Sequence, residues 1–405
     1  MRIRIHNALP WLVALVASVA AASAPAAPGL KEAVEAAWQR QPQAQSAPAR
    51  IDALNARRTA AEALLPAPPA IALTHETDQI DRNLGSRSFA GELSLPLWLP
   101  GQKDRLKAAI DTERGAYDAN LAVARLRVAG EVRESYWQAR AATAEMNQVT
   151  AALEGLAALE ADVARRVKAG ELARVDGNRA QIETQFQRIA QAQAEAHRHR
   201  TLQQFRALTG LAQVPPEDEP RWPGAAPAAG AHPVQEADAR ASQSARARLN
   251  QAAADTRDAP EIGIGTTRQR GDFTKPWEQL VLLRVRIPFG GDNRNLPRIS
   301  AANAELAETL AARAQSAARI EAEAASAERE MQAAVGVVPL AEARLALARD
   351  THELVARGFK AGEFDLTTRL RAERELRDAE LTRSRAVIES GRANSRLKQA
   401  YGVLP

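Results

Sequence analysis

The chain contains Val167-Lys168-Ala169-Gly170-Glu171-Leu172 and repeats it, with changes, as Phe359-Lys360-Ala361-Gly362-Glu363-Phe364, 192 residues later. Three further landmarks recur in the same order at a spacing of 191 or 192: Leu95-Pro96-Leu97 as Ile287-Pro288-Phe289, Thr209-Gly210 as Tyr401-Gly402, and Pro69-Ala70-Ile71 as Pro260-Glu261-Ile262. Landmarks that keep one order and one spacing over most of a chain indicate a duplicated structural unit. We therefore expect one fold unit built twice.

The duplication divides the sequence into four parts. Residues 27–213 form the first repeat, the proline-rich stretch 214–233 is the joint, and residues 234–405 form the second repeat. Residues 1–26 have the pattern of a secretory signal peptide, because two arginines precede a short apolar stretch and small residues. The alternative is an anchoring N-terminal helix, for which the apolar stretch is short. The predicted chain is exported, and no later run of 18 apolar residues predicts a membrane-spanning helix.

Each repeat has the order helix, strand, strand, very long helix, turn, helix. Helices are predicted from alanine-rich stretches with helical spacing that end at proline or glycine, and strands from alternating apolar and polar residues. The predicted elements are 44–65, 71–80, 87–98, 102–167 and 173–208 in the first repeat, and 235–257, 261–270, 278–287, 296–357 and 366–401 in the second.

The helix 102–167 contains no proline and would be roughly 100 Å long. Its apolar residues are mostly three and four apart, which is typical of a coiled-coil seam. The helices 173–208 and 235–257 together nearly equal it in length. We therefore expect these two to stack end to end beside the long helix, with 366–401 stacked on 44–65.

The composition excludes several classes of protein. Aromatic residues make up only 4% of the chain, while 45% is hydrophobic with alanine dominant, which argues for closely packed helices rather than one thick core. The net charge of +5 is too small for a nucleic-acid partner, since acids and bases are evenly mixed. The absence of cysteine excludes disulfides, thiolate metal sites and thiol catalysis.

Nothing in the sequence predicts an enzyme. Neither a Ser-His-Asp pattern nor a glycine-rich phosphate loop is evident. His197 and His199 are two apart on a predicted helix, where side chains point in different directions, so they form a poor chelate. We expect no catalytic residues, no resident metal site and no cofactor.

Two strand pairs cannot close a membrane barrel, because the smallest barrels have eight strands. Strands in lipid need every backbone group paired, so this chain would need partner copies, two giving eight strands and three giving twelve. The alternative is a small soluble β-cap on a helical stalk. The alternation favours the barrel and predicts four lipid-facing side chains: Leu93, Leu95, Leu283 and Val285.

The layout resembles the TolC family of outer-membrane efflux and secretion channels over essentially the whole mature chain. The residues that carry the resemblance are the turn Arg166 to Leu172 with Asp176, its copy Gly358 to Phe364, the strand-to-helix junctions Leu95-Pro96-Leu97 and Ile287-Pro288-Phe289, and the helix ends Leu208-Thr209-Gly210 and Ala400-Tyr401-Gly402. The resemblance implies a mainly α fold in which duplicated coiled-coil hairpins form a periplasmic α-barrel. It also implies a homotrimer whose four strands per chain build a twelve-stranded outer-membrane barrel.

The resemblance further implies a passive exit duct of a tripartite system. Its partners would be outer-membrane lipid, a periplasmic adaptor (membrane fusion protein) and an inner-membrane pump of the RND type. The junction Leu97-Trp98-Leu99-Pro100-Gly101-Gln102 is most similar to the heavy-metal cation-efflux branch, which implies export of metal cations.

Two groups of site residues follow from the resemblance. Adaptor docking is implied for the hairpin tips: Val167, Ala169, Gly170, Glu171, Phe359, Ala361, Gly362 and Glu363. A periplasmic gate is implied at Asp176, with Thr368 and Arg371 in the second repeat. The plainer alternatives are glycines that only supply a left-handed turn and an aspartate favoured by the helix dipole. Thr368 stands where an acidic ring would need a carboxylate, so a mixed pair of Asp176 and Arg371 is the alternative gate.

A second function competes with the channel, namely a structural or adaptor coiled-coil protein of the periplasm. An adaptor would carry one long hairpin flanked by compact domains of many short strands. This sequence instead places two paired strand segments between helices, twice. The channel is therefore the favoured interpretation.

Overall fold

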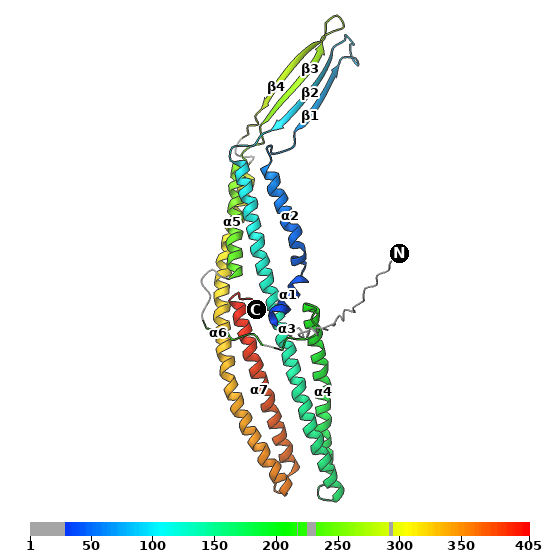
Figure 1. Cartoon of the computed structure of the whole chain (residues 1–405), viewed down its shortest axis with the longest axis vertical. Coiled ribbons are helices and arrows are strands. Elements are labelled where there is room, and N and C mark those ends of the chain that lie inside the picture. Colours follow the sequence, from blue (N-terminus) through cyan, green and yellow to red (C-terminus); the bar gives the residue numbers. More distant parts are fainter. Residues whose placement is uncertain (1–28, 217, 225–231, 291–294) are drawn as a thin grey trace, which may run out of the picture.

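The computed structural model describes residues 29–216, 218–224, 232–290 and 295–405 (Figure 1). The predicted signal peptide, 1–26, lies outside the described residues, as does part of the proline-rich joint. The elements in chain order are α1 (Leu30–Gln39), α2 (Pro42–Glu62), β1 (Ala70–Thr77), β2 (Arg87–Pro96), α3 (Gln102–Ala169), α4 (Arg174–Thr209), α5 (Pro233–Ala254), β3 (Glu261–Arg270), β4 (Glu278–Arg286), α6 (Leu296–Ala361) and α7 (Leu366–Ala400).

Two very long helices set the dimensions of the molecule. α3 has 68 residues and α6 has 66, so each is about 100 Å long. Figure 1 shows the sheet at one end of these helices and the turns α3–α4 and α6–α7 at the other. The predicted fold class, mainly α with duplicated long-helix hairpins and a small four-stranded β part, is confirmed.

The shorter helices stack differently from the prediction. α2 and α4 lie along one side of α3, with α1 packed between them, whereas α5 and α7 lie between α3 and α6 (Figure 1). Gly402, just after α7, lies against His232 and Pro233 at the start of α5. The stacked pairs are thus α2 with α4 and α5 with α7. The prediction was wrong because α2 and α5 have nearly equal lengths, 21 and 22 residues, so either completes a long column.

The largest core lies half-way along the helices. It is formed by residues of α1, α3 and α4: Leu30, Ala33, Val34, Ala37, Val128, Ala129, Val132, Tyr136, Trp137 and Phe205. α1 was not predicted from the sequence, although its apolar residues have the spacing of an amphipathic helix. Its burial against α3 fixes the level at which α2 begins and α4 ends.

The four strands form one antiparallel sheet in the order β1-β2-β3-β4. The β2–β3 pairing joins the two repeats, with Leu93 opposite Ile264 and Arg87 opposite Arg270. β1 and β4 are the two edges, and neither pairs with a further strand in the described part of the chain. The sheet is therefore open at both sides.

α6 contains one stretch that is long and apolar enough to cross a membrane, judged by length and composition alone. The mean hydropathy of this 18-residue stretch is 1.3, and 11% of it is buried. The sequence predicts no such stretch when only uninterrupted apolar runs are considered, because charged residues interrupt this one. The low burial reflects the position of α6, which in the described chain packs mainly on α5 and α7 and leaves its other side uncovered.

Candidate functional site

The two hairpin tips have the same backbone. Gly170 and Gly362 both have φ of 81°, in the left-handed region that glycine tolerates best. The Gly170 amide donates to the Val167 carbonyl at 3.1 Å, and the Glu171 amide donates to the Arg166 carbonyl at 2.9 Å. The second tip repeats this pattern at 3.3 and 2.8 Å. These paired bonds end each long helix and reverse the chain.

Six of the eight predicted docking residues are exposed, three at each tip: Ala169, Gly170, Glu171, Ala361, Gly362 and Glu363. Val167 is only partly exposed. Phe359 has an exposed fraction of 5% and is a core residue of the tip. The docking hypothesis therefore rests on the exposed six, and Phe359 has to be set aside as a contact residue.

A small core beneath the tips joins the two hairpins. Residues of α3, α4, α6 and α7 form it together: Leu156, Val163, Ala180, Phe359, Leu366 and Leu370. The Arg166 guanidinium lies over the Phe359 ring, 5.1 Å from its centroid. In the second tip, the Phe364 ring lies directly on Gly358, which has no side chain to block it. The two tips share a backbone but differ in packing.

The predicted gate residues do not meet within one chain. Asp176 pairs with Arg179 at 3.8 Å, and Arg371 donates to Glu375 at 3.0 Å. The Thr368 amide donates to the side chain of Asp365, which caps α7, at 2.8 Å. The proposed pairing of Asp176 with Arg371 could therefore occur only between chains.

A different set of charges bridges the two hairpins. Glu183 of α4 accepts from Arg374 of α7, with the Nε–Oε2 distance at 3.2 Å, and lies 3.8 Å from Arg377. The Glu183 side chain is only 12% exposed. This hydrogen bond raises the pKa of the Arg374 guanidinium, while burial lowers the pKa of Arg377. No local pattern signals this bridge, because all three residues belong to charge-rich helices.

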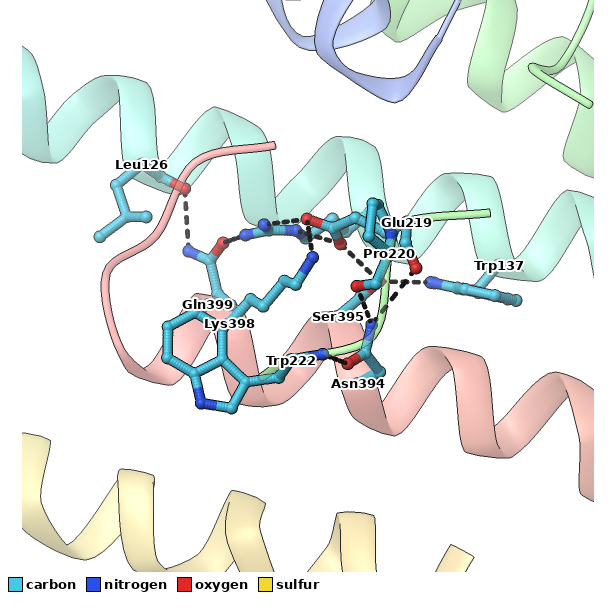
Figure 2. Close-up of polar contacts among 10 residues, drawn as sticks. Leu126, Trp137, Glu219, Pro220, Trp222, Asn394, Ser395, Lys398 and Gln399 are labelled. Atoms are coloured by element: carbon cyan, nitrogen blue, oxygen red, sulfur yellow. Dashed lines mark hydrogen bonds and ion pairs between the residues drawn. The ribbon is translucent and has the colours of Figure 1, made fainter. Parts of the chain in front are cut away.

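A buried polar network fastens the proline-rich joint at mid-length (Figure 2). The Glu219 carboxylate accepts two bonds from Arg133 of α3, at 2.6 and 3.1 Å, and one from Ser395 of α7 at 2.8 Å. Lys398 approaches the same carboxylate at 3.5 Å. The side chains of Arg133 and Glu219 are each only 3% exposed. The joint is therefore tied to both repeats by charge-assisted bonds.

Aromatic side chains complete this mid-length region. The Trp137 indole donates to Ser395 at 2.9 Å, and its ring covers Gly391 so closely that a Cβ there would lie 2.2 Å from it. Tyr136 donates to Asp218 at 2.6 Å, and burial together with this bond raises the Tyr136 pKa well above its usual value. α3 and α7 thus meet in one fixed register.

The four predicted lipid-facing residues lie on one face of the sheet. Leu93 is opposite Ile264, which is opposite Leu283, and Leu95 is opposite Ile262, which is opposite Val285. Directly opposed residues share a face. Leu93, Leu283 and Val285 are 42%, 70% and 60% exposed. The sheet thus presents one continuous apolar face that nothing in the described chain covers.

No metal-binding cluster is formed within the described ranges. No group of three or more His, Asp or Glu residues there has the geometry to hold an ion. His197 lies 3.6 Å from Glu145, and the His75 ring stacks on Phe89 at 4.2 Å.

No family model matches the sequence, and no curated protein matches it. The fold is nevertheless similar to solved outer-membrane structures. The outer membrane protein VceC of Vibrio cholerae has a TM-score of 0.73 at 16% identity, covering 92% of this chain and 96% of that one. CusC, described as forming a transmembrane channel, has a TM-score of 0.74 at 16% identity, covering 92% of each chain. The CmeC outer membrane channel of Campylobacter jejuni has 0.74 at 14% identity, covering 92% and 85%. These similarities establish a shared fold, and their near-equal scores favour no branch.

Proposed function

We propose that this chain is the outer-membrane channel subunit of a tripartite efflux system, acting as a passive exit duct. The observation that carries the proposal is the sheet, which has two open edges and an uncovered apolar face at one end of helices about 100 Å long. The similarity in fold to VceC, CusC and CmeC supports the same role. In this arrangement the sheet lies in the outer membrane and the helices project into the periplasm.

The working form would be a homotrimer. In lipid, unpaired strand edges are costly, and three copies would join β4 of one chain to β1 of the next in a closed barrel of twelve strands. The helices support the same closure. α6 exposes Leu340, Leu347 and Leu354, and α4 exposes Val175, Ile182 and Ile189, each set spaced by seven residues. Heptad stripes of this kind pair in coiled coils, so α6 would pack on α4 of the neighbouring chain.

The adaptor and the inner-membrane pump would meet the tips. Each tip exposes alanine, glycine and glutamate around the turn that ends the long helix. Small residues allow a partner hairpin to approach closely. A trimer would present six such tips, so weak contacts would add up through multivalency.

The gate would use contacts between chains. Asp176 and Arg371 would pair across the trimer, in addition to the bridge from Glu183 to Arg374 within each chain. Asp176→Ala with Arg371→Ala should then raise the conductance of the closed channel. Unchanged conductance would remove these residues from the gate.

The cargo would be metal cations, if the resemblance of residues 97–102 to the heavy-metal branch extends to function. A duct lined by mixed polar residues needs no resident metal site. The test is growth of a deletion strain on divalent and monovalent metal salts, with and without the wild-type chain. Equal sensitivity with and without the chain would assign another cargo.

Three measurements on the wild-type protein test the proposed channel: membrane fractionation, the mass of the detergent-extracted particle, and conductance in a planar bilayer. We expect recovery with the outer membrane, a trimer and a conducting pore. A soluble periplasmic monomer would refute the channel and favour the coiled-coil structural or adaptor protein instead.

A further inference from the structure

Three arginines lie on the sheet face that has the apolar rows, at the strand ends farthest from the helices. Arg87 is opposite Arg270, and Phe89 is opposite Arg268, in the β2–β3 pairing. Arg87, Phe89 and Leu93 are separated by even numbers of residues along β2, so their side chains share a face. The arginines therefore belong to the same face as Leu93 and Ile264, the apolar row.

The distance along the strand places these arginines at the edge of the apolar band. From Leu97, the residue that follows β2, to Phe89 the face extends about 27 Å, at 3.4 Å per residue. This is close to the apolar band of an outer-membrane barrel, which is about 25 Å tall. Arg268 lies level with Phe89, and Arg87 and Arg270 lie one row further out. The three side chains would thus be at headgroup depth in the leaflet that faces away from the helices.

An aromatic shelf supports two of the three guanidinium groups. The Arg268 and Arg270 guanidinium carbons lie 5.1 and 5.0 Å from the centroid of the Trp277 ring. The Trp277 ring in turn lies 6.0 Å from the Phe89 ring. Contacts of this kind hold a guanidinium by its face and leave its N–H donors free at the edge. Arg270 uses Nε for the Gly85 carbonyl at 3.1 Å.

The arginines on the two faces of the sheet differ in whether they have acidic partners. On the opposite face, Arg284 pairs with Glu92 at 2.9 Å and Arg286 lies 3.8 Å from Glu261. None of Arg87, Arg268 and Arg270 has an ion-pair partner among the residues described. The nearest acid along the chain, Asp272, instead accepts from the Thr274 amide at 2.6 Å. The outer edge of the apolar face therefore has three positive charges that no carboxylate of the described chain neutralises.

We propose that Arg87, Arg268 and Arg270 bind the phosphate groups of anionic lipid headgroups in the outer leaflet. The proposal rests on the proposed function, because it requires the sheet to lie in the membrane. Guanidinium groups match phosphate oxygens in charge and in the geometry of their paired donors. Trp277 and Phe89 are suited to headgroup depth, where aromatic rings concentrate. The acyl chains of the same lipids would lie along the apolar rows below.

The test measures lipid binding by the detergent-extracted trimer, using native mass spectrometry with phosphatidylglycerol or phosphatidylcholine as probe. We expect the wild type to bind phosphatidylglycerol more tightly. Arg87→Gln with Arg268→Gln should weaken phosphatidylglycerol binding by about tenfold to thirtyfold, since each arginine near a membrane surface contributes about 1 kcal/mol. Phosphatidylcholine binding should not change. Arg270 is left in place because it also bonds the loop.

Two further variants sharpen this result. Arg82→Gln with Arg286→Gln removes the same charge from side chains that are 78% and 70% exposed and lie outside the arginine cluster, so it should leave lipid preference unchanged. Arg87→Lys with Arg268→Lys keeps the charge and should retain most of the preference. An equal loss in the Arg82 and Arg286 control, or no preference in the wild type, would overturn the proposal.

Two other results would also test the lipid assignment. Displacement of phosphatidylglycerol by millimolar inorganic phosphate would show a free-phosphate site and overturn the lipid assignment. If the glutamine pair does not assemble, the salt dependence of the wild type decides instead. The preference for phosphatidylglycerol should fall as NaCl rises from about 0.05 to about 0.5 M, because salt screens exposed charges. A preference that does not change with salt would refute the arginines' role.

Failure of this inference is distinct from failure of the proposed function. A wild-type chain recovered as a soluble monomer would refute the channel itself. A membrane trimer that conducts but does not distinguish phosphatidylglycerol from phosphatidylcholine would refute only the lipid site.

Discussion

The long helices α3 and α6 occupy corresponding places in the two repeats, yet their surroundings differ. α3 contacts α1, α2, α4, α5 and α7, whereas α6 packs mainly on α5 and α7 and touches α3 near the tips through Phe359. At mid-length, three positions of α3 and their counterparts 192 residues later are Arg133, Tyr136 and Trp137 against Ala325, Glu328 and Arg329. α3 is thus adapted to a filled interior and α6 to an uncovered edge.

The strands repeat this difference. Among the described residues, β2 pairs on both sides, while its counterpart β4 pairs only with β3. In each case the second repeat lacks the neighbour that the first repeat finds within the chain. A ring of copies would supply both missing neighbours at once, since α2, α4 and β1 lie at the opposite edge. The uncovered edge of the second repeat is therefore the edge that would join the next copy in the proposed trimer.

The largest effect should come from the interior around α3. Glu219→Ala would leave Arg133 and Lys398 buried without their carboxylate, which should cost about 3–5 kcal/mol of unfolding free energy. Denaturant unfolding of the detergent-extracted protein, followed by circular dichroism, measures this.

The matched control lies at the same level on α6. Glu328→Ala removes an exposed carboxylate that accepts from the Tyr401 hydroxyl, and should cost about 1 kcal/mol. Equal losses in the two variants would mean that the surroundings of α3 and α6 are energetically alike.

The next effect compares the two faces of β4. Leu283→Arg should make membrane insertion less favourable by about 2–4 kcal/mol, because it puts a charge on the lipid face. Leu282→Arg, one residue earlier on the face that already has Arg284 and Arg286, should insert normally. Leu93→Arg should behave like Leu283→Arg. The yield of membrane-extracted trimer is the measurement, and equal yields for Leu282→Arg and Leu283→Arg would assign the wrong face to lipid.

The uncovered side of α6 provides a third comparison. Leu347, 72% exposed in the single chain, should be buried in the trimer, so Leu347→Asp should weaken each interface by at least about 1.5–3 kcal/mol. Particle mass against protein concentration should reveal dissociation into monomers. Leu404→Asp, which changes an exposed leucine outside α6, is the control. A Leu347→Asp trimer as robust as the wild type would leave the α6 stripe without a partner.

The smallest effect on stability is expected at the tips. No atom lies within 4 Å of a Cβ placed on Gly170 or Gly362, so bulk fits there and only the positive φ is strained. Gly170→Trp with Gly362→Trp should leave the trimer assembled but block adaptor docking, measured by cross-linking and efflux-dependent resistance. Gly170→Ala with Gly362→Ala has the same backbone strain without bulk and should dock. Normal cross-linking by the tryptophan variant would place docking elsewhere.

Much of the candidate site was accessible from the sequence because its signals are local. The turns at Gly170 and Gly362, and the shared face of Leu93 and Leu283, follow from glycine placement and strand alternation. The network around Glu219 was missed, since Arg133 and Glu219 are 86 residues apart and no local pattern links them. The bridge from Glu183 to Arg374 was missed for the same reason, at a separation of 191.

Apart from α1, the sequence by itself determined the order, type and approximate length of the elements and their duplication. The predicted helix 102–167 is found as Gln102–Ala169, and the predicted strand 261–270 as Glu261–Arg270. Proline, glycine and apolar periodicity act within a few residues, so each can be interpreted without knowing what lies nearby.

Only the tertiary structure decided which short helices share a column, that Phe359 is buried beneath its tip, and that α6 has an uncovered side. Each of these three features depends on which segment, distant in the sequence, packs beside the residues concerned. α2 and α5 have almost the same length, and Phe359 and Val167 are both apolar residues three positions before a turn glycine. Local sequence preferences do not distinguish the two members of each pair, whereas contacts with residues distant in the sequence do.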